Sequence, residues 1–296
     1  TRCRHQVGPG VFLYVSPGTG DTQIAYGDTV DFYIMSIEEQ TIKEYAVSYL
    51  LTAAECGPEQ RMTPSLMVNR LIDVATLHAN YLGIGYARLQ ADGLAWVLSR
   101  VSLEMKRWPS VGEEYALRTW VEGCNRLFSQ RNMEITSVES GEVLGYARTI
   151  WMAIDIKRRV AGEIPSLDTL AQVVVEDRPC PIAPTPRLRE PKGDDMHDTA
   201  YTFRYTDLDF NRHVNTVRYL ELLIDQWPLA WYDSHSLVRL DMAFLHEALY
   251  PQSVTVTTAT DADNPMRFTQ QITGPDGPCM RAAFTWRPDE YHPVCD

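Results

Sequence analysis

Two Asp, two Asn and one His lie within one short segment, DLDFNRHVN, which runs from Asp207 to Asn215. In an extended chain, side chains two positions apart point to the same side, so Asp209, Asn211 and His213 are expected to face one cleft. A carboxylate, an amide and an imidazole placed together can activate water and bind a developing oxyanion. The segment therefore predicts a catalytic site.

Two other interpretations of this segment start from the same residues. An EF-hand loop beginning at Asp207 needs Gly at position 212 and Glu at position 218, and the chain has Arg212 and Arg218 there. A calcium loop is therefore disfavoured, and we expect no metal and no cofactor. Asp and Asn ahead of a helix are also favoured caps and turn formers. The residues alone leave this purely structural role open.

The composition limits the classes of protein to consider. The length of 296 residues suits two domains of ordinary size or one large domain. A net charge of −12 argues against nucleic acid as a partner, because its phosphates repel an acidic chain. No apolar run approaches the ~20 residues needed to cross a bilayer, and no signal peptide is recognisable. The sequence leaves the choice between monomer and homodimer open.

Cysteine usage indicates a reducing compartment. The chain has six scattered Cys and no C-x-x-C pair, so free thiols and a cytoplasmic location are expected. They are Cys3, Cys56, Cys124, Cys180, Cys279 and Cys295.

Composition breaks divide the chain. Residues 1–40 lack sustained periodicity and are expected to be a disordered extension or upstream sequence, because Met35 resembles a natural protein start. Residues 176–200 are rich in Pro, which predicts an extended interdomain linker. The remaining chain is expected to form two domains and a tail: 41–175, 201–288 and 289–296.

Both domains show the same order of elements. In each, an amphipathic helical pattern precedes a series of alternating strand patterns, which predicts an α+β unit twice over. Apolar residues mark the two helical faces: Met67, Leu71, Val74, His78 and Tyr81, then Val217, Leu220, Ile224 and Trp227, with Pro228 expected to end the second helix. In the strand VLSRVSLEM, Val97, Val101, Leu103 and Met105 are predicted to share one face, with Arg100 and Glu104 on the other. Matching landmarks of the two domains are Arg100 with Arg239 and Pro109 with Pro251.

A long helix wrapped by an antiparallel sheet is the hotdog fold, and the segment YTDLDFNRHVNTVRYLELL makes the resemblance specific. It resembles the active-site segment of the acyl-acyl carrier protein (acyl-ACP) thioesterases of plants and bacteria, whose D-x-N-x-H motif opens the second hotdog helix. The resemblance extends from about Tyr45 to Trp286 and is closer to the bacterial type. It implies a tandem (double) hotdog that hydrolyses the thioester of fatty acyl-ACP, releasing free fatty acid and holo-ACP.

The resemblance also implies the catalytic residues. The family's Asp, Asn and His match Asp209, Asn211 and His213, and its catalytic Glu, on the following strand, matches Glu247. We expect Glu247, acting with His213, to be the general base. Plant members carry Cys beside that Glu, and this chain has Ala248 there, so a thiol nucleophile is not expected.

The first helix lacks the motif, and in the resembling family that half holds the acyl chain. The predicted pocket residues are Leu71, Val74, Ala75, His78 and Trp96, with ordinary core packing as the alternative. Because acyl carrier proteins are acidic, a local basic patch is expected to dock the carrier. The predicted docking residues are Arg126, Arg131, Lys157, Arg158 and Arg159.

Three alternative functions stay open at this stage. An acyl-coenzyme A thioesterase shares most of the chemistry and differs in the carrier. A hotdog dehydratase or hydratase also uses a His at a helix start, but the D-x-N-x-H motif with a downstream Glu favours hydrolysis. A non-catalytic acyl-binding protein would not need the polar residues, and all of them are present.

Overall fold

The computed structural model divides the chain into two compact units, Thr1–Ile42 and Lys43–Asp296. It describes residues 43–165, 167–193 and 195–289, together with three strands of the first unit. Those strands form an antiparallel sheet in the order β1 (Cys3–Gly8), β2 (Val11–Val15), β3 (Thr22–Tyr26). The expectation of a disordered or upstream segment at 1–40 otherwise lies outside the described residues, as does most of the tail.

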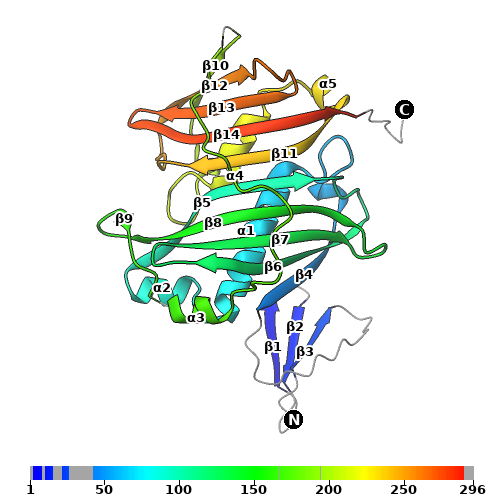
Figure 1. The fold of residues 1–296 in the computed structure, drawn as a ribbon, viewed down its shortest axis with the longest axis vertical. Helices are drawn as coiled ribbons and strands as arrows, with labels where there is room; N and C mark the ends of the chain where they lie inside the picture. Colours follow the sequence, from blue (N-terminus) through cyan, green and yellow to red (C-terminus); the bar gives the residue numbers. More distant parts are fainter. Residues whose placement is uncertain are drawn as a thin grey trace. The chain divides into compact units, whose positions relative to one another are not determined.

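One antiparallel sheet of 11 strands forms the second unit (Figure 1). The first half of the chain contributes β4 (Glu44–Leu50), β5 (Leu94–Met105), β6 (Glu114–Cys124), β7 (Phe128–Ser137), β8 (Val143–Asp155) and β9 (Val160–Ala161). The second half contributes β10 (His197–Thr202), β11 (His235–Phe244), β12 (Ser253–Thr260), β13 (Arg267–Gly274) and β14 (Gly277–Pro288). The strand order is β10-β12-β13-β14-β11-β5-β8-β7-β6-β4, with β9 paired to β8.

This order has internal symmetry. From the centre of the sheet outward, each half begins with the strand that follows its main helix, β5 or β11. Its other strands then come in reverse chain order. The halves meet where β11 pairs with β5, and the register places Asp241 opposite Ser102. Since Arg239 matches Arg100, Asp241 is also the counterpart of Ser102, so a pseudo-two-fold axis passes through this pair. The predicted duplicated α+β hotdog architecture is confirmed.

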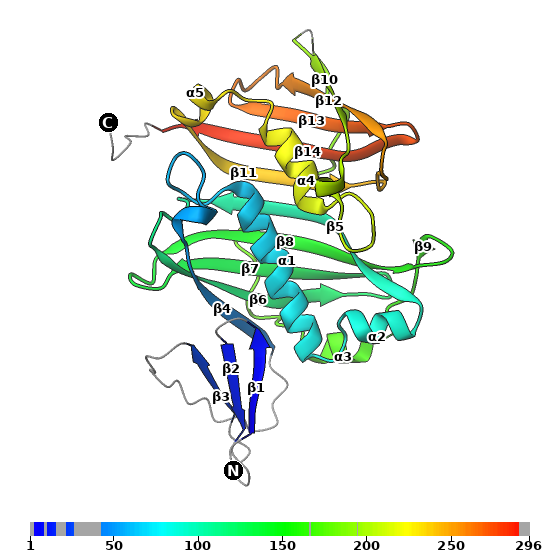
Figure 2. The same ribbon diagram turned by 180° about the vertical axis from the view of Figure 1, so that it is seen from behind.

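Two main helices lie against one face of the sheet (Figure 2). They are α1 (Pro64–Tyr81) and α4 (Thr216–Ile224). The side chain of Thr63 caps α1 by accepting the Leu66 N–H, and Asn215 caps α4 by accepting the Val217 N–H. Shorter helices are α2 (Tyr86–Ala91), α3 (Leu167–Gln172) and α5 (Leu229–Tyr232), with 3-10 turns η1 (Ala53–Glu55) and η2 (Tyr205–Asp207). Among the described helices, none has the length and apolar character to span a bilayer.

Two local predictions about these elements are wrong. The second long helix ends at Ile224, before Trp227, and Pro228 precedes α5 instead of ending α4. Val97 is 43% exposed, and Leu98 is buried in its place. The register of β5 against β8 shifts between Leu98 and Arg100, and a bulge of this kind moves the following side chains to the other face.

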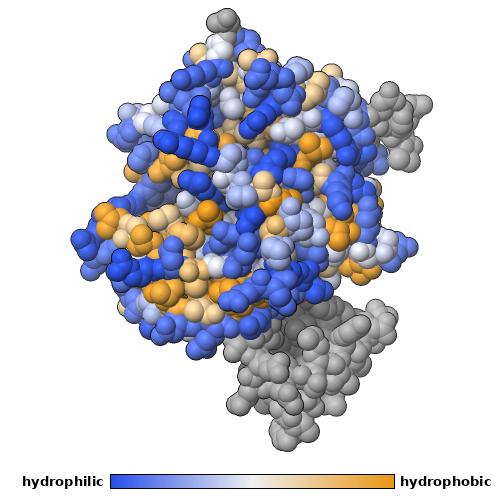
Figure 3. Space-filling view, in the orientation of Figure 1, coloured by the Kyte–Doolittle hydropathy of each residue, from blue (hydrophilic) through white to orange (hydrophobic). Residues whose placement is uncertain are grey.

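The predicted Pro-rich linker crosses the face of the sheet opposite the helices, from β6 toward β11 (Figure 1). Side chains of the sheet bond to its backbone: Trp120 to the Arg178 oxygen, Arg148 to that of Ile182 and Arg239 to that of Ala183. Hydrophobic and hydrophilic residues are interspersed on this face (Figure 3). The extended form is therefore fixed by polar contacts, and β10 begins at His197, before the expected end of the linker.

Candidate active site

The polar segment folds into a closed loop between η2 and α4. Leu208 and Val214 form an isolated bridge, and the Asp209 N–H donates to the His213 carbonyl oxygen at 2.8 Å. Arg212 has a positive φ of 66°, which turns the chain back on itself. The expectation of an extended segment is therefore wrong, and simple alternation does not direct its side chains.

Asp209 organises this loop through the backbone. Its Oδ1 accepts the N–H of Asn211 at 2.8 Å and the N–H of His213 at 3.0 Å. Asp207, which is buried, accepts the Arg204 N–H at 2.6 Å. Capping and turn formation thus account for these two carboxylates as well as for Asn215.

His213 and Glu247 face each other across two loops. We call residues 208–214 the catalytic loop, after the catalytic residues that the sequence predicts in it. The loop after β11 docks onto it, because the Val214 N–H donates to the Ala248 oxygen at 3.2 Å. The distance from His213 Nδ1 to Glu247 Oε2 is 3.1 Å, and their side chains are 31% and 37% exposed. Glu247 therefore lies just beyond β11, not on a strand as predicted, and the pair is open to a substrate.

Tyr219 on α4 holds the loop that carries Glu247. Its hydroxyl oxygen accepts the Ala248 N–H at 2.7 Å and so fixes the loop that carries Glu247. Burial raises the pKa of this hydroxyl above its ordinary value, so it stays neutral. The sequence analysis did not single out Tyr219, although its place on the inner face of the second helix was a usable signal.

The first half of the chain completes the site. Arg159, in the turn after β8, pairs through its guanidinium with Glu247 Oε1. The Glu247 carboxylate is therefore shared between Arg159 and His213. Tyr86 of α2 contacts Phe210 of the catalytic loop edge-to-face, with ring centroids 5.8 Å apart.

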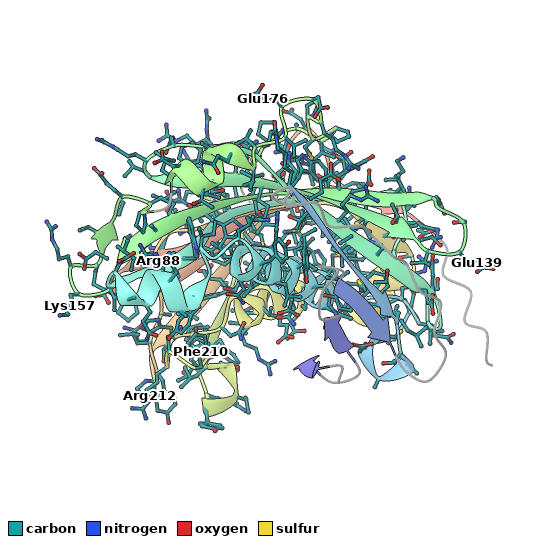
Figure 4. The ribbon with its side chains drawn as sticks, turned by 90° about the horizontal axis from the view of Figure 1, so that it is seen from below. Arg88, Glu139, Lys157, Glu176, Phe210 and Arg212 are labelled. Carbon is teal, nitrogen blue, oxygen red and sulfur yellow. The ribbon has the colours of Figure 1, made fainter. Side chains whose placement is uncertain are left out.

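Asn211 and Phe210 are both exposed at the tip of the loop, Phe210 by 77%. In Figure 4 the labelled Arg88, Lys157, Phe210 and Arg212 lie on one side of the molecule, with Glu139 on the other. Basic side chains from three segments of the chain therefore lie on the same side of the molecule as Phe210.

The predicted docking residues separate into different environments. Arg131 is 4% exposed, and its Nη1 lies 2.6 Å from His78 Nδ1, so its prediction as a docking residue is wrong. Burial lowers the pKa of Arg131 to about 10. Arg126 is exposed and pairs with Glu163 at 3.5 Å. Lys157 and Arg158 are exposed in the turn that also carries Arg159.

Four of the predicted pocket residues are buried, and the fifth, Trp96, is half-buried. Leu71, Val74, Ala75 and His78 are buried along α1, and the Trp96 indole N–H donates to the Ile84 oxygen at 2.8 Å. Their packing is compatible with a core role and with lining an acyl tunnel, so the acyl-pocket assignment stays a prediction.

A duplicated helix-on-sheet unit, with a polar loop opening the second main helix, defines a double hotdog protein. Residues 42–170 match the acyl-ACP thioesterase N-terminal domain, and residues 190–288 match the acyl-ACP thioesterase C-terminal domain. The chain therefore belongs to the acyl-ACP thioesterase family.

Named relatives agree with this membership. A palmitoyl-acyl carrier protein thioesterase, chloroplastic, of Gossypium hirsutum is 26% identical over 74% of this chain and 56% of its own length. An oleoyl-acyl carrier protein thioesterase 2, chloroplastic, of Arabidopsis thaliana is 25% identical over 79% of this chain and 67% of its own. The chain spans 56%, 62% and 54% of three such plant relatives.

Solved structures show the same fold. An acyl-ACP thioesterase from Bacteroides thetaiotaomicron has a TM-score of 0.75 and 26% identity, over 86% of this chain and all of that one (100%). A 12:0-ACP thioesterase from Umbellularia californica has a TM-score of 0.72 at 18% identity, over 83% and 98%. The second comparison supports the fold alone.

Proposed function

We propose that this chain hydrolyses the thioester of a fatty acyl-ACP, releasing free fatty acid and holo-ACP. The observation that carries the proposal is the exposed His213–Glu247 pair in a double hotdog of this family. In the reaction the oxygen of water bonds to the thioester carbonyl carbon, and the carbon–sulfur bond then breaks. The proton taken from water passes to the leaving thiolate.

The contacts of Glu247 support a division of roles that differs from the sequence-based expectation. Both oxygens of the Glu247 carboxylate are engaged, Oε1 by the Arg159 guanidinium and Oε2 by His213 Nδ1. Glu247 can instead accept the Nδ1–H of His213, which leaves Nε2 of the imidazole to take the proton of water. His213 is then the general base, and Glu247 orients it and stabilises its charge. The exposed Asn211 amide supplies a donor for the carbonyl oxygen.

The direct test compares thiol release from acyl-ACP and acyl-coenzyme A, each carrying the same acyl chain. We expect a higher kcat/KM for acyl-ACP, because the basic residues on the same side of the molecule as Phe210 are suited to an acidic protein carrier. Equal or greater kcat/KM with acyl-coenzyme A would favour the coenzyme A thioesterase alternative. Binding without hydrolysis of either substrate would favour an acyl-binding protein.

Arg159→Ala should lower kcat by about 10-fold to 100-fold, a part of the roughly 10²–10⁴ that general-base catalysis contributes. The reason is that Glu247 loses the partner that holds it toward His213. Arg159→Lys should recover part of this loss, because an ammonium keeps the charge. Steady-state kinetics with acyl-ACP measure kcat and KM separately.

Arg158→Ala is the matched control for Arg159→Ala, since it removes a neighbouring exposed cation. It should leave kcat unchanged and raise KM for acyl-ACP if the turn docks the carrier. If Arg159→Ala also raised only KM, Arg159 would be the docking residue predicted from sequence, with no role in positioning Glu247.

Ala75→Phe should shift the preference toward shorter acyl chains if α1 lines the acyl tunnel. Each excluded methylene changes affinity by about 0.8 kcal/mol, so two carbons change it about tenfold. The ratio of kcat/KM values for short and long acyl-ACP substrates measures the shift. Leu77→Phe, at a more exposed position of the same helix, is the control. A lower melting temperature with an unchanged preference would assign Ala75 to the core alone.

A further inference from the structure

The first half of the chain contains a backbone copy of the catalytic loop. The loop from Cys56 to Met62 is closed by an isolated bridge, as Leu208 and Val214 close the catalytic loop. The Gly57 N–H donates to the Arg61 oxygen at 2.9 Å, where the catalytic loop has a bond of 2.8 Å from Asp209 to His213. Each loop follows a 3-10 turn and precedes a main helix. The duplication therefore extends to the bonding of these loops.

Further correspondences identify which residue replaces which. Gln60 has a positive φ of 55°, as Arg212 has of 66°. The Met62 N–H donates to the Pro109 oxygen, as the Val214 N–H donates to the Ala248 oxygen. Pro109 is thus the counterpart of Ala248, and the sequence-based match of Pro109 with Pro251 is wrong.

The chemistry at the copied positions differs from that of the catalytic loop. Arg61 stands in the place of His213, and Trp108 stands in the place of Glu247. A guanidinium and an indole cannot accept a proton near neutral pH, so this second loop cannot perform general-base hydrolysis. Its polar groups can still bind a ligand.

A hollow of about 230 Å³ lies at this copied loop. It is lined by Arg61, Arg107, Trp108 and Ser110 of the first half and by Ser236, Arg287 and Asp289 of the second half. Both halves of the chain contribute, as they do at the catalytic loop. Asp289 follows β14 as Arg159 follows β8, and it pairs with Arg61 at 2.8 Å. The volume is too small for a long acyl chain and sufficient for one small polar group.

The lining is rich in hydrogen-bond donors. Three Arg side chains line the hollow: Arg61 is ion-paired with Asp289, Arg107 is ion-paired with Glu113 and Glu142, and Arg287 adds a third guanidinium. Arg107 is held in place by two bonds to Glu113, and these bonds raise its pKa above the ordinary value. Arg287 donates to the Lys106 oxygen at 2.9 Å through one of its five N–H groups, which leaves others to bind a ligand. The Ser110 and Ser236 hydroxyls add donors.

We propose that this hollow is a binding site for a small oxyanion, a phosphate or carboxylate group. Guanidinium groups bind both anions through paired charge-assisted hydrogen bonds. The proposal is independent of hydrolysis at His213, because it rests on the residues of the copied loop. Binding there would place an anion at the junction of the two halves.

Isothermal titration calorimetry of the full chain tests the site with sodium phosphate and, separately, sodium acetate, at ionic strength held constant with sodium chloride. We expect one saturable site for at least one of these anions, and the pair distinguishes phosphate from carboxylate. Arg287→Gln should raise Kd about tenfold, because it removes a charge-assisted hydrogen bond. Arg118→Gln, which removes an exposed cation on β6, is the matched control and should leave Kd unchanged.

Arg61→Gln gives a second variant in the lining of the site, and circular dichroism verifies that each variant is folded. The proposal is overturned if neither anion binds saturably. It is also overturned if Arg287→Gln and Arg61→Gln both bind the anion with the Kd of Arg118→Gln.

Discussion

His213→Ala and Glu247→Ala should each lower kcat for acyl-ACP hydrolysis by roughly 10²–10⁴-fold, the contribution of general-base catalysis. The two side chains are 3.1 Å apart and act in one proton transfer, so the double variant should lose little more than either single variant. Steady-state and single-turnover kinetics measure the loss. The melting temperature should change little, because both side chains are about one third exposed.

His246→Ala is the matched control for this prediction. His246 is exposed beside Glu247 in the same loop and should retain full kcat. Replacing all six Cys by Ser or Ala should also leave substantial turnover, since Ala248 occupies the place of the plant Cys. Full activity of His213→Ala and Glu247→Ala, or loss of hydrolysis in a folded cysteine-free variant, would contradict the proposed mechanism.

The candidate site was predictable in its residue types and only partly in its geometry. The spacing of Asp209, Asn211 and His213, with the family resemblance, identified the segment and its partner Glu247. The closed loop was not predictable, because a positive φ at Arg212 is unusual for a residue with a side chain. As a result, the role of Asp209 is visible only in its bonds to backbone N–H groups.

The positions of Arg159 and Arg131 show why the charge of a residue alone does not predict where its side chain lies. Arg159 lies in a turn rich in basic residues, and its contact with Glu247 exists only because β5 and β11 join the two halves. Arg131, Met133 and Ile135 follow one another at spacings of two along β7 and so share one face of the strand. Met133 and Ile135 are both buried. That spacing indicated an inward direction for Arg131, and its charge led to the opposite prediction.

The fold was easier to predict from the sequence than the site, because the signals for the fold are periodicity and repetition. Similar landmarks in the two halves predicted the duplication, which the symmetric strand order confirms. The details that failed, such as the face of Val97, depend on a bulge. A bulge has no strong signal in a single sequence, since one extra residue leaves the composition of the strand unchanged.

Asp241→Ala should lower the free energy of unfolding by about 3–5 kcal/mol, the usual cost of removing one partner of a buried ion pair. Asp241 is 4% exposed at the centre of the sheet, where the two halves meet. It accepts bonds from Arg239 Nε at 2.8 Å and Ser102 Oγ at 2.6 Å. Burial lowers the pKa of Arg239, but its bonds to Asp241 outweigh this and raise the pKa above the ordinary value.

Removing the Asp241 carboxylate leaves the half-buried Arg239 guanidinium with Glu104 and the Ala183 oxygen as its partners among the described residues. The same change weakens the junction between the halves and the attachment of the linker, since Ser102 also bonds to Thr185 at 2.7 Å. Urea denaturation, followed by far-UV circular dichroism, measures the effect. Asp233→Ala, at an exposed position after α5, is the control and should change stability by less than about 0.5 kcal/mol. Equal stabilities for the two variants would show that the two halves are held together without this buried pair.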